Sequence, residues 1–554
     1  MTINYFGKNT SSKQLFNDRL INNPPPVIAI DVETISLKEQ IPIGFSISTS
    51  PDDSWYFRTY PEHDPEIELV KPLLNNPNIL KVFHNAIFDM RIFPLIYDID
   101  ESNIFCTNVA ARLIGYQEAK LSELALAVSN TVLVTAPDLL AEYGKKNMLE
   151  LPYEEVSAMC CSHARATLLL YDEFKDKIDK NYMSVEMQAI PILNDMSQRG
   201  MRVNEKDRAE LETHLTEEAA YYRKLCEDED FNPGSPAQVG YILAKRGNFL
   251  KMTAKRKQYR TDSGTLEFLD DPIASIVLSY RRVNKLLTTY IIPLRDKDRI
   301  YTNYNLDARV GRVSSSKMNL QNIPGPDKNR KLLPEGTRYI FMPDNGVFTS
   351  VDASQEHMRI LYHFSQDREM RRVFEEGEFE GDIHKKTASE MSISRKFAKV
   401  LNYAIPYGAD ARTVSVQSKI RDEKRCARFL DSWFESYPDA ADWIRGAKEE
   451  GLRDGFALPT LFGRRIRVPE ETNRWGKVDT AAMGRKCINY PILGSDGEVM
   501  KRALIICEGE HLPLAVTVHD SISCDGDIEF PIEKLENITP FKLPWVVKKT
   551  LRWE

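Results

Sequence analysis

Two aspartates, Asp352 and Asp520, each follow a short apolar run that is typical of a buried strand. The runs cover residues 347–351 and 514–518. Strands that each end in an acidic residue can bring distant carboxylates together at one edge of a sheet. Such carboxylates suit two-metal phosphoryl transfer, in which ions about 3.5–4 Å apart bind the attacking and leaving oxygens. Taken alone, either aspartate could equally be a turn residue at the end of its strand.

Four residues at a spacing of four predict a second chemical feature, a helix face with two cations and two rings. They are Arg395, Lys399, Tyr403 and Tyr407. The cations can hold a triphosphate, and a ring on the next turns can stack on a nucleobase. An ordinary amphipathic helix with a basic face gives the same pattern. Pro406 removes one backbone hydrogen bond, so we expect a kink just before Tyr407.

Three regions of different pattern must position these groups. Helical and strand patterns alternate from residue 27 to about 174, which indicates an α/β domain. Within it, residues 27–48 predict a strand, an acidic turn over 31–34, and a second strand. Residues 182–293 are mostly helical and highly charged. Loops rich in Gly, Pro and Asn follow residue 301 and precede the two aspartate strands and several long helices.

Composition is that of a soluble globular protein and leaves nucleic-acid binding open. Hydrophobic residues make up 42% of the chain and charged residues 28%, and no apolar run approaches the ~20 residues of a membrane span. The net charge of −7 argues against a nucleic-acid partner. Phosphate binding depends on the local field, however, and basic clusters lie at 251–260 and 464–467. The eight cysteines lack paired spacing, which predicts reduced thiols and a cytoplasmic location.

The stretches around these groups resemble the motifs of family A DNA polymerases, in the family's order. Residues 350–355 (SVDASQ) and 516–520 (VTVHD) are similar to motifs A and C. Between them, residues 382–388 resemble DIHxxTA, and the run from Arg395 to Gly408 is similar to motif B. Further similar segments are GRVSS at 311–315, NLQNIP at 319–324, TLFGRR at 460–465 and the helix that carries Arg485 and Asn489.

The resemblance, which extends from about residue 190 to the C-terminus, implies a multi-domain α/β chain. An RNase H-like exonuclease domain over residues 1–180 is expected to precede a right-hand polymerase domain over 181–554. The implied reaction is template-directed DNA synthesis by nucleotidyl transfer from dNTPs to a primer 3′-hydroxyl. Within the hand, the expected parts are a thumb over about 190–305, a palm over about 306–380 and 440–554, and fingers over about 381–439.

The resemblance also implies a role for each matching residue. Asp352 and Asp520 would hold two Mg²⁺ ions, for which Mn²⁺ can substitute, and Lys399 would assist catalysis. The residues implied at the nucleotide are Gln355, His357, His384, Arg395, Lys399, Tyr403 and Tyr407. The residues implied at the primer–template are Arg312, Asn319, Gln321, Gly408, Arg485, Asn489 and His519.

Asp31, Glu33 and Asp89 resemble the metal-binding acids of the 3′–5′ exonuclease domain, which also uses two metal ions. Where the third exonuclease motif has Tyr-x3-Asp, this chain has Met159 and His163. Imidazole binds divalent metals but is a poor ligand for Mg²⁺. We therefore expect an exonuclease fold with weak or absent activity, and a scaffold role for the domain is the alternative.

Several polymerase positions also depart from the family pattern. His357 stands where the family has the Glu that excludes a ribose 2′-hydroxyl and contacts the motif B tyrosine, which puts rejection of ribonucleotides in question. Ser521 replaces a Glu, and Leu493 replaces a Gln that contacts the minor groove. The helix after motif C is expected to be short, because few residues follow Asp520.

Other functions are disfavoured by particular residues. A single-subunit RNA polymerase carries Met-Thr where this chain has Tyr403, and an inactive nucleic-acid-binding scaffold has no reason to keep both aspartates with Arg395 and Lys399. A nuclease alone is disfavoured because the nuclease site is the altered one. The expected partners are primer–template DNA and dNTPs, and no membrane is expected. The protein is expected to be a monomer, with a replication helicase or a processivity factor as a possible further partner. The compact plan, with no 5′-nuclease segment, resembles a phage-type enzyme acting in the host cytoplasm.

Overall fold

The computed structural model describes residues 2–5, 16–36, 39–61, 63–64, 67–227, 230–253, 258–326, 336–418, 420, 422–473 and 476–553. Residues 255–257 of the first basic cluster lie outside the described residues. Contacts divide the chain into two compact units, Met1–Asp195 with Tyr304–Ser314, and Met196–Asn303 with Ser315–Glu554. Helix α8 (Lys180–Arg199) begins at the expected domain boundary, which itself stays a prediction.

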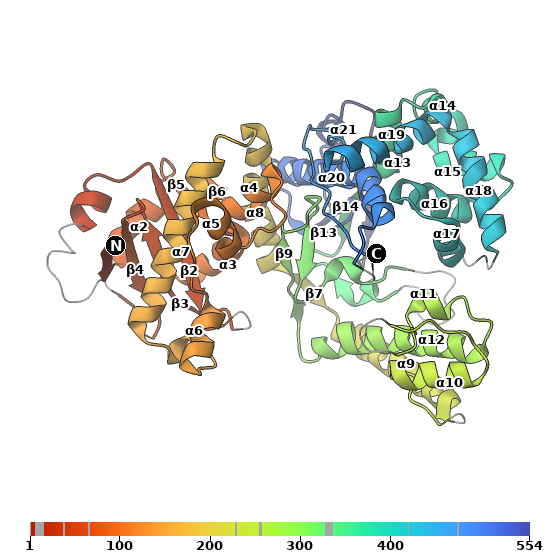
Figure 1. Cartoon of the computed structure of the whole chain (residues 1–554), viewed down its shortest axis with the longest axis horizontal. Coiled ribbons are helices and arrows are strands. Elements are labelled where there is room, and N and C mark those ends of the chain that lie inside the picture. The colour runs from red at the N-terminus through yellow and green to blue at the C-terminus, as the bar shows by residue number, and fades with distance from the viewer. Residues whose placement is uncertain are drawn as a thin grey trace. The chain divides into compact units, whose positions relative to one another are not determined.

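The first unit contains a six-stranded mixed sheet in the order β1-β4-β3-β2-β5-β6 (Figure 1). Helix α7 (Tyr153–Phe174) packs across β2 and β3. The strands are β1 (Thr2–Tyr5), β2 (Val27–Thr34), β3 (Pro42–Ser48), β4 (Asp53–Arg58), β5 (Leu80–Phe83) and β6 (Ile104–Cys106). The other helices and turns are η1 (Asn17–Ile21), α2 (Ile67–Leu74), α3 (Ala86–Ile92), η2 (Phe93–Leu95), α4 (Thr107–Ile114), α5 (Leu121–Ser129), α6 (Ala136–Tyr143) and η3 (Met148–Glu150).

Strand β2 is continuous, so the predicted acidic turn is wrong. Asp31 and Glu33 pair with Ser46 and Gly44 of β3, and this antiparallel pairing keeps the backbone extended to Thr34. Alternate residues of a strand lie on the same face of the sheet. The strand therefore presents Asp31 and Glu33 together.

In the second unit, a four-stranded antiparallel sheet in the order β13-β14-β12-β15 positions the acidic residues. The predicted strand over 514–518 is confirmed as β13. The strand predicted over 347–351 starts one residue later and continues to Ala353, because it pairs with β15 to that point. The strands are β12 (Phe348–Ala353), β13 (Leu514–Val518), β14 (Ser521–Asp525) and β15 (Trp545–Thr550). Smaller sheets contain β7 (Met201–Val203), β8 (Arg299–Ile300) and β11 (Phe341–Met342), and β9 (Asn303–Asn305) with β10 (Ser314–Ser316).

The predicted helical region over 182–293 is confirmed, and helices also surround the larger sheet of the second unit. The first group is α9 (Glu205–Glu227), α10 (Pro236–Lys245), α11 (Ser263–Leu266), α12 (Pro272–Leu286), η4 (Leu287–Ile291) and η5 (Ile292–Leu294). Short turns η6 (Leu320–Asn322) and η7 (Arg338–Ile340) follow. The later helices and turns are α13 (Glu356–Ser365), α14 (Arg368–Phe374), η8 (Glu378–Gly381), α15 (Ile383–Glu390), α16 (Arg395–Ala404), η9 (Ile405–Tyr407), α17 (Ala411–Ser418), α18 (Glu423–Ser436), α19 (Pro438–Asp454), α20 (Thr480–Gly509) and α21 (Ile532–Glu536).

Helix α16 ends at Ala404, and the 3₁₀ turn η9 continues to Tyr407. The predicted kink before Tyr407 stays a prediction, because the helix type changes after Ala404 while Ala404 and Ile405 keep helical backbone angles. The prediction of one continuous helix face is wrong at Tyr407, because Pro406 lacks the N–H that would extend the α-helix. The short helix expected after Asp520 is also confirmed, since α21 has five residues. None of the helices in the described residues combines the length and the apolar composition that a membrane crossing needs.

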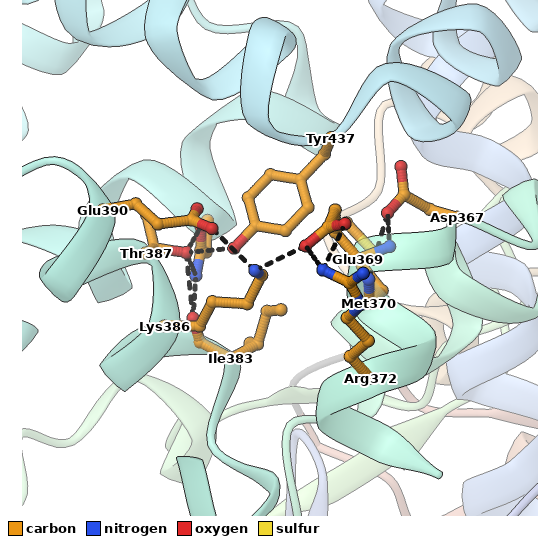
Figure 2. Close-up of polar contacts among 10 residues, drawn as sticks. Asp367, Glu369, Met370, Arg372, Ile383, Lys386, Thr387, Glu390 and Tyr437 are labelled. Atoms are coloured by element: carbon orange, nitrogen blue, oxygen red, sulfur yellow. Dashed lines mark hydrogen bonds and ion pairs between the residues drawn. The ribbon is translucent and has the colours of Figure 1, made fainter. Parts of the chain in front are cut away.

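A buried carboxylate joins the starts of two of these helices. Asp367 has no exposed surface, and its two oxygens accept four backbone N–H groups at 2.9–3.1 Å. Two of the donors begin α14 and two begin α19, so one side chain caps both helices. Figure 2 shows Asp367 at the N-terminus of α14.

A buried lysine links α14 to α15 in the same region (Figure 2). Lys386 Nζ lies 2.8 Å from Glu369 Oε2 and 2.6 Å from Glu390 Oε1, and Lys386 is only 4% exposed. Beside it, the hydroxyls of Thr387 and Tyr437 lie 2.8 Å apart. These polar contacts fix α15 against its neighbours, and α15 carries His384.

Candidate active site

The pairing of strands brings Asp352 and Asp520 to the same end of the four-stranded sheet. Asp352 of β12 pairs with Ser521 of β14. Asp520 occupies the turn between β13 and β14 together with His519, whose φ is +54°. The backbone N–H of Ala353 donates to the Asp520 carbonyl oxygen at 3.0 Å, which closes this turn against β12.

The two carboxylates affect each other electrostatically. Desolvation, and then the charge of Asp520, raises the pKa of Asp352 to about 6, while Lys399 acts in the opposite direction. Burial and the charge of Asp496 raise the pKa of Asp520. Asp352 nevertheless keeps an exposed surface on which a ligand can bind. Neighbouring carboxylates that disfavour each other's charge are suited to divalent cations, which relieve the repulsion.

Helix α16 presents Lys399 and Tyr403 to these carboxylates. The Ser394 hydroxyl accepts a backbone N–H and caps the first turn of this helix. Lys399 Nζ lies 5.6 Å from the centroid of the Tyr403 ring. Burial, followed by the charges of Asp520 and Asp352, raises the pKa of Tyr403. The structure therefore brings Asp352, Asp520, Lys399 and Tyr403 into one electrostatic environment.

His384 is buried beside Tyr403, with 5.7 Å between the ring centroids. Burial lowers the pKa of His384 to about 4, so the ring is neutral near pH 7. The side-chain amide of Asn402 donates to His384 Nδ1 at 2.9 Å, which places the ring proton on Nε2. A neutral imidazole in this orientation is a hydrogen-bond donor for an anionic oxygen. Asn402 was not predicted, and its sequence signal is only a polar residue on the buried face of α16.

Arg395 and Gln355 contact the segment that begins α15. Arg395 Nε donates to Asp382 Oδ2 at 2.7 Å, and Asp382 in turn caps the helix. The Gln355 amide donates to the Gly381 carbonyl oxygen and accepts from the Ile383 N–H, both at 2.9 Å. In this structure both side chains therefore position α15, and their contacts with a nucleotide stay predictions.

His357 connects α13 with Tyr407 and with α20. Its Nδ1 hydrogen-bonds the Tyr407 hydroxyl at 3.2 Å, and its Nε2 lies 3.6 Å from Asp496 Oδ1. Its ring centroid is also 5.8 Å from that of Tyr403. The tyrosine contact expected of a Glu is thus made by an imidazole. Asp496 was not predicted, although its position seven residues after Asn489 places both on one face of α20.

Tyr403, Tyr407, Gly408 and Arg485 line one pocket. Gly408 has a φ of +68°, and a Cβ at this position would lie 2.7 Å from Cγ of Arg485. The left-handed backbone and the close contact both require glycine here. Asn489 follows Arg485 by one turn on α20. The pocket combines aromatic rings with a cation, which suits a stacked base near a phosphate backbone.

The remaining predicted DNA contacts are placed in different units. Arg312 belongs to the segment Tyr304–Ser314 of the first unit, whereas Asn319 and Gln321 lie in the second. The Ser315 hydroxyl donates to Asn319 Oδ1 at 3.0 Å at the start of η6. The DNA-binding roles of these three residues and of His519 stay predictions.

In the first unit, Asp31, Glu33 and His163 offer ligand atoms that all lie within 4.8 Å of one another. His163 Nδ1 is 3.6 Å from both Asp31 Oδ2 and Glu33 Oε1. Burial lowers the pKa of His163, but hydrogen bonds and charges from the two acids outweigh this and raise it. Asp89 on α3 is buried, and burial followed by the charge of Asp31 raises its pKa. The structure thus gathers the acids expected at an exonuclease site.

Comparison with known proteins identifies the family. Residues 201–540 match the family described as DNA polymerase family A, and residues 8–179 match a 3′–5′ exonuclease family. The chain belongs to DNA polymerase family A. The predicted order of an exonuclease domain before a polymerase domain is confirmed.

Relatives of this family A chain are bacterial DNA polymerases I. It is 29% identical to that of Chloroflexus aurantiacus over 90% of this chain and 57% of the relative. It is 35% identical to the thermostable DNA polymerase I of Thermus thermophilus over 58% of this chain and 41% of the relative. The chain thus spans about two fifths to three fifths of the length of these relatives.

A solved structure has the same fold as this chain. It is the POL domain of Pol1 from M. smegmatis in complex with DNA primer-template and dNTP. The two share 22% identity with a TM-score of 0.79, and the match covers 99% of each chain.

Both departures from the exonuclease pattern are also present in the folded first unit of this family A chain, at Met159 and His163. Met159 is buried in an apolar cluster with Ile43 and Val156, and it offers no hydroxyl to the acids. His163 occupies the place next to Asp31 where a carboxylate was expected. Position 163 therefore lacks the fourth carboxylate, which the third exonuclease motif would supply.

Proposed function

We propose that this chain is a DNA-directed DNA polymerase that adds nucleotides from dNTPs to a primer 3′-hydroxyl. The observation that carries the proposal is the placement of Asp352 and Asp520 at one sheet edge, next to Lys399 of α16. The strand pairing that joins them is long-range, and family membership supports the same reading.

Asp352 and Asp520 are the residues that would hold divalent ions, with Mg²⁺ as the expected metal and Mn²⁺ as a substitute. Such ions, when bound, activate the primer hydroxyl and stabilise the charge that develops on the phosphates. Lys399 and Arg395 are exposed cations on one face of α16 and suit the triphosphate. His384 donates its Nε2–H without adding charge. Arg395 donates to Asp382 through Nε, and its terminal NH₂ groups can donate to phosphate while that contact remains.

The pocket lined by Tyr403, Tyr407, Gly408 and Arg485 is the proposed place of the templating base and its neighbouring phosphate. His357 separates the two tyrosines from Asp496 and is the proposed contact near the sugar. The proposed macromolecular partner is primer–template DNA. A helicase or processivity factor, the monomeric state and the cytoplasmic location stay predictions from the sequence.

Primer extension by the full chain tests this proposal. With a labelled primer on all four templating bases, we expect extension with dNTPs and Mg²⁺, less with rNTPs, and none above background for Asp352→Ala. Asp442→Ala is the matched control, because Asp442 is an exposed acid on α19. Extension by Asp352→Ala at the parent rate would show that the proposed site is wrong. Preference for rNTPs would favour the RNA polymerase alternative.

We also propose that the 3′–5′ exonuclease activity is weak or absent, because His163 stands where the fourth carboxylate is needed. Digestion of a mismatched 3′ end measures this directly. Slow or undetectable release of nucleotides is expected in Mg²⁺ and in Mn²⁺. Brisk release in either metal would contradict the proposal.

A further inference from the structure

The Asp31–Glu33–His163 cluster has the donor set of a metal site, but its donors differ from those that suit Mg²⁺. Two carboxylates come from alternate positions of β2, and an imidazole comes from the middle of α7. The ligand atoms of these three side chains all lie within 4.8 Å of one another, which no other group of three acidic, His or Cys side chains shows in the described part of the chain. Because the set spans a strand and a helix, tertiary packing holds it together.

A contact outside the cluster fixes the direction of the imidazole. His163 Nε2 lies 2.9 Å from the carbonyl oxygen of Val134, so this nitrogen carries the proton and donates. Nδ1 then faces Asp31 and Glu33, and an ion bound between these groups would replace the proton that Nδ1 shares with the two acids. A histidine that binds a metal commonly donates its other ring N–H to a backbone carbonyl in this way.

A second contact supports the carboxylate side. Cys160, one turn before His163 on α7, donates its thiol to the carbonyl oxygen of Asp31 at 3.4 Å and lies 3.5 Å from Asp31 Oδ2. Cys160 is fully buried. Asp31 is therefore supported from the helix that provides the imidazole.

The chemistry of these donors discriminates between metals. Mg²⁺ favours six oxygen ligands in a regular octahedron, and imidazole is a poor substitute for one of them. Imidazole favours transition metals and carboxylates accept Mn²⁺, so this mixed set suits a transition-metal dication, with Co²⁺ bound more tightly than Mn²⁺. Asp89 does not belong to this group of donors at the same distance, so the three side chains form one site for one ion.

We infer that Asp31, Glu33 and His163 form a site for a single transition-metal dication, of the Mn²⁺ or Co²⁺ class, in place of a pair of Mg²⁺ ions. The site concerns the exonuclease-like unit and does not depend on the proposed DNA synthesis.

Nitrogen coupling to bound Mn²⁺ tests the inference without an activity assay. The full chain carrying Asp352→Ala is loaded with one equivalent of Mn²⁺ at pH 8, and electron spin echoes are recorded. We expect modulation from a directly coordinated ¹⁴N, which His163→Ala abolishes. The control His214→Ala removes an exposed histidine of α9 and should leave the modulation unchanged.

Calorimetric titration with Mn²⁺, Co²⁺ and Mg²⁺ provides the second measurement. We expect His163→Ala to weaken Mn²⁺ and Co²⁺ binding by about tenfold or more, because a ligand and its support are lost. His163→Asp should strengthen Mg²⁺ binding relative to Mn²⁺, and its thermal melting shows whether it folds. The inference is overturned if Mn²⁺ shows no nitrogen coupling, or if the parent and His163→Ala bind Mn²⁺ equally. In that case His163 serves only as an internal counter-ion for the two acids.

Discussion

His357 is expected to help exclude ribonucleotides through a contact that includes Asp496. The perturbation is His357→Ala, which removes an imidazole placed between the Tyr407 hydroxyl and the buried Asp496 carboxylate. The side chain of His357 is only 13% exposed, so its removal leaves space next to two tyrosines. This space lies where the family pattern has the Glu side chain that excludes a ribose 2′-hydroxyl.

The size of the effect follows from these contacts. Admitting or rejecting one small group in a pocket is worth about 1–3 kcal/mol, or 10- to 200-fold in selectivity. Losing the hydrogen bond to Tyr407 belongs to the lower part of this range, about 1 kcal/mol. We therefore expect His357→Ala to reduce the preference for dNTPs over rNTPs by about 10- to 100-fold. Asp496→Ala should affect the preference between the two sugars through the imidazole at 3.6 Å, and we expect about a three- to tenfold reduction.

Single-nucleotide insertion kinetics measure this preference as the ratio of kcat/KM for a dNTP to that for the matching rNTP. The ratio is the useful quantity because Asp496 also affects Asp520, and that effect is common to both nucleotides. The double variant should show the same ratio as His357→Ala alone. His363→Ala is the control, since His363 lies on the same helix but its ring contacts Phe541.

Two results would refute the reasoning. An unchanged ratio in His357→Ala would show that the imidazole does not face the sugar. Fully additive effects in the double variant would show that Asp496 acts by a route other than His357.

Three further changes test other parts of the structure. Asp367→Ala should lower the free energy of unfolding by about 2–4 kcal/mol in urea titration, because two helix caps are lost and buried N–H groups are left without an acceptor; a loss below about 0.5 kcal/mol would contradict this. Lys386→Met should lower the free energy of unfolding by about 1–3 kcal/mol, because Glu369 and Glu390 lose their shared cation while both stay partly exposed to water. Lys396→Met, at an exposed lysine, is the control, and an equal loss in this control would refute the prediction. The folded-state pKa of Asp352 is raised from near 3.8 to about 6, so its protonated form favours folding and that stabilisation is lost as pH rises through about 6. Asp352→Asn should therefore have a higher melting temperature than the parent at pH 8 in chelator, and the difference should shrink toward pH 4. Mg²⁺ should raise the melting temperature of the parent only. Equal melting temperatures at pH 8 would argue against the raised pKa.

The sequence by itself indicated which residues of this protein could carry chemistry. Asp352, Asp520 and the basic residues of α16 could be found because their types and short-range spacing follow from helix and strand periodicity. The order of the motifs then determined the family, which the comparison confirmed. The loss of a carboxylate at position 163 was also visible, because the identity of a ligand is a local property of the chain.

Only the tertiary structure decided how these residues act on one another. Strand pairing, not spacing, put Asp352 next to the turn that carries Asp520. Packing of α20 against α13 brought the unpredicted Asp496 to His357, and packing of α7 across β2 turned His163 toward Asp31 and Glu33. Electrostatic effects depend on distance and desolvation in three dimensions. The raised pKa of Asp352 and the lowered pKa of His384 therefore could not be read from neighbours in the chain.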